Sequence, residues 1–190
     1  DRAAVTGAVG RVLERIGRPS RVGLVLADPV AKVSLLRLQQ VPAKATDLDQ
    51  VIRWQVRKSA PFAIDDAQVA YVPGSTAADG QDFIVTLARR DVVAEYESLC
   101  AGFGAQAGVV DLSTFNVVNA VVAGGAVPGG DWLLVNVAPG WESIAIMRGH
   151  DPIFFRSHGV DGEGTLADVV HQTAMYYEDR LGGKIGRAHV

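Results

Sequence analysis

The chain has 190 residues, of which 48% are hydrophobic and 21% are charged, with a formal net charge of −3 at pH 7. This balance predicts a globular chain with a buried core and excludes general disorder, which requires low hydrophobicity and high net charge. No run of uninterrupted apolar residues is long enough to cross a bilayer, and the basic residues are scattered, which argues against a nucleic-acid surface. The single cysteine, Cys100, cannot form an intrachain disulfide, and this favours a reducing compartment such as the cytoplasm.

The first part of the chain alternates between helical and strand patterns. In chain order, the patterns predict helix 3–16, strands 21–26 and 32–38, a helix from 46 to about 60, strands 68–72 and 82–88, helix 91–103, strand 108–110 and a helix from 113. The first helix is expected to bury one face, formed by Val5, Val9, Val12, Leu13 and Ile16.

Helix starts and one loop are also predicted in this part. Thr46 and Asp49 have the spacing of a capping-box-like pair, and Asp91 and Ser113 are expected to cap the next two helices. An Asp-Pro turn separates the first two strands. Segment 73–80 is rich in Gly, Ser, Thr and Asp, so we expect an exposed loop there.

A glycine-rich segment, 124–130, is the predicted boundary between two α/β pieces. Beyond it, strands 132–137, 143–147 and 153–156 predict a β-meander, and a last helix follows over about 165–181. Segment 161–164 precedes that helix and is interpreted as an ordinary turn in preference to an anion site, because two carboxylates would repel phosphate. We therefore expect pieces over 1–123 and 131–190, with the second cut short at its C-terminal end.

Common catalytic and metal-binding patterns are missing from the sequence. The histidines, at positions 150, 158, 171 and 189, do not have zinc-ligand spacing. Cys100 falls on the apolar face of a predicted helix, where burial would raise its pKa and make it a poor nucleophile. Neither glycine-rich phosphate-loop motif is present.

The segment from Val135 to Ser143 has the pattern of a strand, a tight Pro-Gly turn and a second strand. In a phosphate-binding hairpin, the N–H groups of the turn face a nucleotide and an acidic side chain organises the metal. Here Asn136 stands at the strand end and Pro139 has no N–H to donate. The residues alone therefore favour a plain hairpin turn over a nucleotide site.

Trp54 lies off the apolar face of the second predicted helix, three and four residues before Arg57 and Lys58. An aromatic ring among cations, followed by Pro61 and Phe62, has the composition of an anchor for a partner chain. The alternative interpretation, equally open, is that Trp54 packs beneath a strand of its own domain.

Several of these runs resemble one family in the same order. The run 51–66, with Trp54 and the Pro61-Phe62 turn, resembles the Trp-containing helix and Pro-Phe turn of the type IV pilus assembly protein family PilM. The strand with Tyr71, the helix with Cys100 and the run 110–116 resemble the same family, as do 132–147, 153–156 and 175–180. The resemblance covers nearly the whole chain and is strongest at 53–66 and 110–119.

The resemblance implies an α/β fold with actin-like (ribonuclease H-like) lobes and an inserted subdomain of the kind found in the cell-division protein FtsA. The cytoplasmic part of the secretion protein GspL has a related layout. By resemblance, residues 1–123 hold the inserted subdomain (within 1–88) and the remainder of the first lobe, and residues 131–190 begin the second lobe. The phosphate loop of the family would precede Asp1 and its adenosine loop would follow Val190, so we expect a chain truncated at both ends.

The resemblance also implies a function. It predicts a noncatalytic cytoplasmic scaffold, peripheral at the inner membrane, in type IV pilus or type II secretion-like assembly. Such a scaffold captures the cytoplasmic tail of a bitopic PilN-like inner-membrane protein as a strand or short apolar segment in a groove; homo-oligomers are left open. The residues expected to face the partner are Trp54, Arg57, Lys58, Pro61 and Phe62.

ATP is the cofactor that the family often holds between its lobes. The family has Asp and Gly where this chain has Asn136 and Ala138, so the resemblance implies a degenerate nucleotide site, with ATP expected only in the full-length protein. The residues of that site are Asn136, Ala138, Pro139, Gly140, Trp141 and Glu142.

Two alternatives belong to other classes of protein. An ATP-dependent enzyme of the actin and sugar-kinase superfamily would need a carboxylate base beside the hairpin, where this chain has Asn136. A plain interaction domain without a ligand would use Trp132 and Trp141 only for packing.

Overall fold

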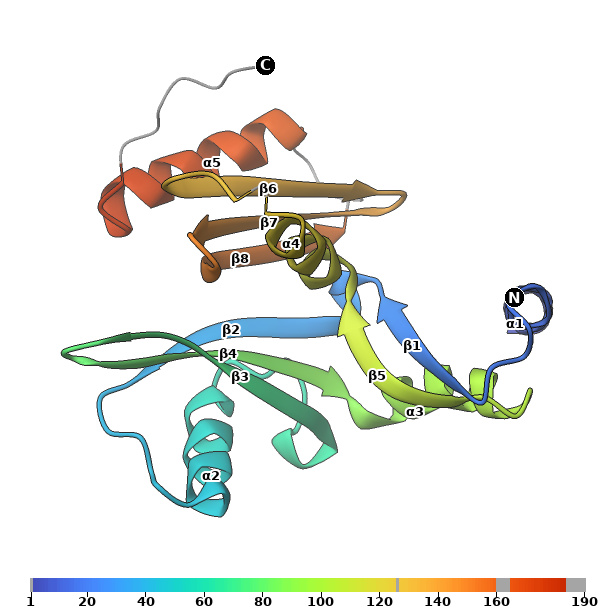
Figure 1. The fold of residues 1–190 in the computed structure, drawn as a ribbon. Coiled ribbons are helices and arrows are strands. Elements are labelled where there is room, and N and C mark those ends of the chain that lie inside the picture. Colours follow the sequence, from blue (N-terminus) through green and yellow to red (C-terminus); the bar gives the residue numbers. More distant parts are fainter. Residues whose placement is uncertain (1, 126, 160–164, 184–190) are drawn as a thin grey trace.

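The computed structural model describes residues 2–125, 127–159 and 165–183 of the chain (Figure 1). The helices and strands are, in order, α1 (Arg2–Arg15), β1 (Arg21–Leu26), η1 (Asp28–Val30), β2 (Ala31–Leu38), α2 (Ala45–Val56), η2 (Ile64–Asp66), β3 (Ala67–Ala77), β4 (Gly80–Arg89), α3 (Arg90–Ala101), β5 (Gln106–Leu112), α4 (Ser113–Ala123), β6 (Asp131–Ala138), β7 (Trp141–Arg148), β8 (Asp151–Gly159) and α5 (Leu166–Arg180). No helix among these residues is both long and apolar enough to span a membrane.

The strands form three sheets within the described residues. β1 and β5 pair in parallel, β2, β4 and β3 form an antiparallel sheet in that order, and β6, β7 and β8 form the predicted meander. Figure 1 shows α2 on the outer side of the β2–β4–β3 sheet, and α4 and α5 on opposite sides of the β6–β7–β8 sheet. Helix α4 therefore packs on the β6–β7–β8 sheet and also contacts β1 and β5.

Strand alternation gives the β2–β4–β3 sheet two different faces. On β4, Phe83, Val85 and Leu87 are buried in a core with Ile52 and Val56 of α2. The intervening β4 side chains point to the other face of the sheet, away from α2. This second face forms one wall of the groove described below.

The predicted burial of the first helix is wrong for three of its five apolar residues. Val5, Val12 and Ile16 are 48%, 55% and 59% exposed, and the buried residues of α1 are Gly10 and Leu13. Helix α1 packs on α3, and the Phe103 ring occupies the space that a side chain at position 10 would need. Leu13 and Val9 pack against Cys100 of α3 and against Val22 and Leu24 of β1. The buried stripe of α1 is therefore narrower than the helical periodicity suggested.

The predicted side-chain caps of α2, α3 and α4 are also wrong. The N-cap residues are Lys44, Arg89 and Leu112, and none of them makes a side-chain cap hydrogen bond. Asp49 instead forms an ion pair with Arg53 at 2.7 Å, and the Asp91 carboxylate forms an ion pair with the N-cap residue Arg89. Spacing alone cannot tell a cap from a surface ion pair, because both use the same side chains.

The loop predicted over 73–80 is wrong in its secondary structure, although most of the segment is exposed as predicted. β3 continues to Ala77 and pairs with β4 almost to the tip of the hairpin. A register shift between Pro73 and Thr76 accommodates the proline, which cannot donate to the ladder. The turn predicted at 161–164 lies outside the described residues.

Helix α5 is tied to the β6–β7–β8 sheet by a cluster at its C-terminal end. The Tyr177 hydroxyl donates to Asp131 Oδ2 at 2.8 Å, and Arg148 donates to the same carboxylate from Nη2 at 2.7 Å and Nε at 3.0 Å. These hydrogen bonds, chiefly the one from Arg148, lower the pKa of Asp131. The folded state therefore favours the ionised carboxylate.

We predict that Asp131→Asn lowers the free energy of unfolding by about 1 kcal/mol at pH 7, because the Arg148 side of the cluster is half exposed. A lowered carboxyl pKa contributes stability above the unfolded value and loses it as the pH falls through the folded value. The deficit should therefore shrink below about pH 4 in urea unfolding curves. Asp179→Asn, at an exposed position of α5, is the matched control. An equal deficit at pH 7 and pH 3 would contradict the assignment.

Candidate functional site: a groove between the sheets

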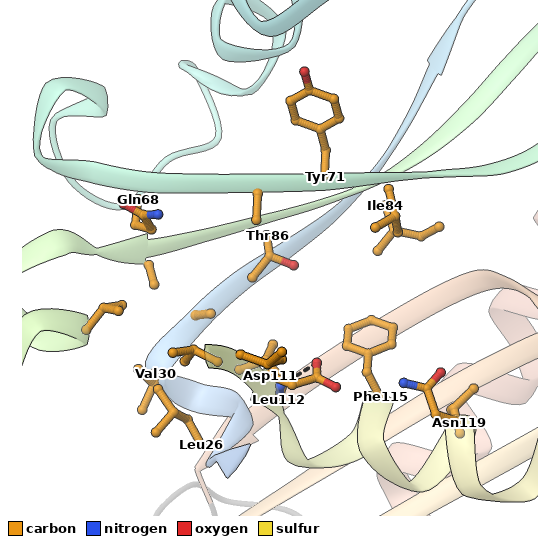
Figure 2. A pocket seen from close by; sticks show the side chains of 18 of the residues that line it. Leu26, Val30, Gln68, Tyr71, Ile84, Thr86, Asp111, Leu112, Phe115 and Asn119 are labelled. Carbon is orange, nitrogen blue, oxygen red and sulfur yellow. Dashed lines mark hydrogen bonds between the residues drawn. The ribbon is translucent and has the colours of Figure 1, made fainter. Parts of the chain in front are cut away.

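A groove of about 690 Å³ runs along the face of the β2–β4–β3 sheet that is turned away from α2. β3 and β4 form one wall, and η1, β5 and the first half of α4 form the other. Figure 2 shows Ile84 and Thr86 extending from β4 toward α4, where Phe115 and Asn119 extend toward the sheet. The Tyr71 ring lies on the far side of β3 and belongs to the α2 core.

The groove keeps apolar surface accessible that a closed core would bury. Val72 on β3 and Val109 on β5 are 57% and 63% exposed, and both line the groove. In the described sheet β3 pairs only with β4, so one edge of β3 keeps unpaired backbone groups. An apolar channel beside an open strand edge suits an extended peptide segment, which can both fill pockets and add backbone hydrogen bonds.

The charged side chains of the groove have one sign. Glu97, Asp111 and Asp151 line it together with His150, and no Lys or Arg is among the described residues of the lining. Such a groove favours an occupant that carries a cation over one that carries a carboxylate. The arrangement therefore suits a mainly apolar segment with at least one Lys or Arg.

A buried carboxylate fixes the wall of the groove formed by η1 and α4. Asp28 is 0% exposed, and its Oδ1 accepts a hydrogen bond from the backbone N–H of Thr114 at 3.0 Å. Its Oδ2 accepts a second hydrogen bond from the Thr114 hydroxyl. Asp28 thus performs the capping role that Ser113 was expected to fill, and does so from a position 86 residues earlier in the chain.

The same turn of α4 also contacts the β6–β7–β8 sheet. Asn136 Nδ2 donates to Ser113 Oγ at 3.2 Å and to Thr114 Oγ1 at 3.0 Å. One residue further on, the Phe115 ring stacks on Phe155 of β8 with centroids 5.0 Å apart. The first turn of α4 is therefore where the groove, the buried carboxylate and the β6–β7–β8 sheet meet.

We predict that Asp28→Ala lowers the free energy of unfolding by about 2–3 kcal/mol, since it removes a helix cap and leaves a buried N–H and hydroxyl without their acceptor. Asp47→Ala, which removes an exposed carboxylate from the first turn of α2, should change it by less than about 0.5 kcal/mol. Denaturant unfolding of both variants measures the difference. Equal effects would show that the Asp28 hydrogen bonds add nothing beyond surface electrostatics.

The six residues predicted for a nucleotide site lie along the β6–β7 hairpin, where Pro139 and Gly140 form a two-residue turn. Asn136 is engaged by α4, and Glu142, 6% exposed, pairs with His158 Nε2 at 2.9 Å. Ala138 and Trp141 are the paired residues that close the hairpin. None of these six residues is cationic, and the Asn136 and Glu142 side chains already have protein partners, so neither is available to organise a metal ion. The degenerate nucleotide site stays a prediction.

The five residues predicted to face a partner lie on the other side of the β2–β4–β3 sheet from the groove. Trp54 is 68% exposed, and Arg57 and Lys58 are exposed without an ion-pair partner in the described part of the chain. Pro61 is exposed, whereas Phe62 is half-buried and packs against the α2 core. The structure therefore brings Trp54, Arg57, Lys58 and Pro61 to one surface, and their binding role stays a prediction.

The groove and Asp28 were missed by reasoning from the sequence. The only sequence feature that marks the groove wall on β4 is Thr86, a polar residue within the apolar run 83–88. Asp28 was interpreted as half of an Asp-Pro turn, and nothing nearby in sequence points to Thr114. Cys100 is buried as predicted, and burial raises its pKa. Within the described residues, which exclude His189, no group of three His, Cys, Asp or Glu could hold a metal.

No family model matches the chain, and no curated protein matches it. Among solved structures it is similar to a chain of a PilM–PilN type IV pilus biogenesis complex, with a TM-score of 0.73 and 19% identity over 94% of this chain and 53% of that one. It is also similar to the cytoplasmic domain of EpsL, an inner-membrane component of the type II secretion system of Vibrio cholerae, with a TM-score of 0.57 and 10% identity over 96% and 64% of the two chains. A third neighbour is a Bacteroides thetaiotaomicron protein with an actin-like ATPase fold and unknown function, with a TM-score of 0.53 and 8% identity over 91% and 61%.

These similarities confirm the predicted actin-like α/β fold. The chain spans between about half and two thirds of the length of these three neighbours.

Proposed function

We propose that the protein is an actin-like scaffold of a type IV pilus or type II secretion-like machine, which binds the cytoplasmic tail of a PilN-like bitopic inner-membrane protein in the groove. The observation that carries this proposal is the groove itself, with its accessible apolar walls, acidic side chains and free strand edge. A tail that is disordered alone would be ordered by lying along β3 and β4. Through that tail the protein would be cytoplasmic and peripheral at the inner membrane.

The structural neighbours support the choice of machine. One is a complex named for PilM and PilN in type IV pilus biogenesis, and another is a cytoplasmic domain from an inner-membrane component of a type II secretion system. A fold shared at 19% and 10% identity does not carry function across by itself. The groove adds an independent reason, because its chemistry suits a peptide tail.

The surface formed by Trp54, Arg57, Lys58 and Pro61 is the second partner-facing region of the proposal. An exposed Trp beside two cations is typical of a binding anchor. Because this surface and the groove lie on opposite sides of one sheet, one short tail cannot occupy both. Substitutions on each side therefore separate the two assignments.

We predict that Thr86→Arg weakens tail binding at least about tenfold, because it places a long cationic side chain in the groove, which would fill the channel and repel a cationic tail. The probe is a fluorescein-labelled synthetic peptide that spans the cytoplasmic tail of the PilN-like protein from the same genome. Fluorescence anisotropy with the full-length protein gives the dissociation constant.

The matched control is the double variant Trp54→Ala, Arg57→Glu on the opposite side of the sheet. If the tail occupies the groove, this variant binds the peptide like the wild type. Loss of affinity in the double variant with full affinity in Thr86→Arg would place the tail on α2 instead. A wild-type protein that does not bind the peptide at millimolar concentration would contradict the proposed function.

The nucleotide site is proposed to be degenerate and the protein noncatalytic, since Asn136 and Glu142 are both held by protein partners. We predict that the full-length protein titrated with Mg-ATP in a calorimeter shows no saturation below millimolar nucleotide. Micromolar binding would contradict the degenerate site, and the protein would then be a nucleotide-dependent scaffold. Release of inorganic phosphate at a rate above that of a buffer control would favour the alternative, an ATP-dependent enzyme of the actin and sugar-kinase superfamily.

A further inference from the structure

The groove is completed by residues of the β6–β7–β8 sheet. His150, in the turn between β7 and β8, and Asp151 and Pro152 at the start of β8 belong to its lining. β8 also contacts β2, β3 and η1, which belong to or adjoin the walls of the groove. The sheet that follows the glycine-rich segment therefore forms part of the site that a bound tail would touch.

Three kinds of contact hold that sheet against α4. Val118 of α4 is buried with Ala145 and Met147 of β7 in an apolar cluster. The Asn136 carboxamide donates to the hydroxyls of Ser113 and Thr114, and Thr114 is in turn fixed by the buried Asp28 carboxylate. We call this chain of four residues the latch. Phe115, the next residue of α4, stacks on Phe155 of β8 and lines the groove with its ring.

From these contacts we propose that the latch gates the groove: the β6–β7–β8 sheet must be held on α4 through Asn136 for the groove to bind its occupant tightly. The proposal rests on the proposed function and adds its regulation. Without the Asn136 hydrogen bonds, the sheet keeps only apolar and aromatic contacts with α4, which are not directional. The sheet can then shift on α4, and the His150–Pro152 wall of the groove shifts with it. Only the fraction of molecules with the latch closed presents the complete groove, and the apparent affinity falls in proportion to that fraction.

The geometry also explains why the gate would act on the groove in particular. The link between Asn136 and the groove passes through consecutive residues of one helical turn, Ser113, Thr114 and Phe115. Thr114 is fully buried, so its hydroxyl has no water to replace a lost partner. A change at Asn136 is therefore transmitted to Phe115 through a packed and hydrogen-bonded turn.

The test uses the same fluorescein-labelled tail peptide and the full-length protein. Asn136→Ala removes the donor of the latch and is expected to raise the dissociation constant about tenfold. Asn116→Ala, at an exposed position of α4 outside the latch and the groove, is the matched control and should bind like the wild type. Circular dichroism and the thermal midpoint establish that each variant is folded.

A double-variant cycle separates gating from a general loss of stability. His150→Ala removes a contact from the sheet side of the groove and should weaken binding in the wild type but much less in Asn136→Ala, because the open latch has already withdrawn that wall. Additive losses, or an Asn136→Ala protein with wild-type affinity, would overturn the gate while leaving the proposed function intact. If Asn136→Ala does not fold, Ser113→Ala removes one of the two acceptors; a smaller weakening supports the gate and no change overturns it. If the wild-type protein does not bind the peptide, the proposed function itself is wrong.

Discussion

A carboxylate with no solvent exposure connects parts of the chain that lie far apart in sequence. Asp28 lies two residues after the end of β1 and accepts hydrogen bonds from both the backbone N–H and the hydroxyl of Thr114. These hydrogen bonds fix where α4 begins. Because a buried carboxylate is costly unless its oxygens are bonded, the position of α4 relative to β1 is tightly constrained. The remaining contacts of the groove wall depend on that position.

The β2–β4–β3 sheet serves two surfaces because its strands alternate. One set of side chains forms a closed core with α2, while the other set faces α4 and β5 across an open channel. A sheet buried on both faces would carry apolar residues at nearly every position, but Thr86 and Gln68 interrupt the pattern on the groove side. The sheet is thus stabilised through its α2 face and, at Val33 and Ile84, through part of the groove face, and the rest of the groove face stays open.

The β6–β7 hairpin uses two of its polar side chains for contacts within the protein. In the expected nucleotide hairpin the strand-end side chain and the following acid would face a ligand, whereas here Asn136 faces α4 and Glu142 faces His158. Both of these side chains therefore make their polar contacts within the protein. Asn136 joins this sheet to α4, whereas the Glu142–His158 pair lies within the sheet.

Composition and periodicity by themselves determined the type and order of nearly all helices and strands, the meander at 131–159 and the burial of Cys100, because these depend on local spacing and hydrophobicity. The family resemblance added the actin-like fold. Only the tertiary structure decided which apolar residues of α1 are buried, what caps α4, how far β3 extends and where the groove lies. The extent of β3 depends on its pairing with the next strand, β4. The other features depend on partners distant in sequence, such as Asp28 with Thr114 or Ile84 with Phe115, and local periodicity does not predict such contacts.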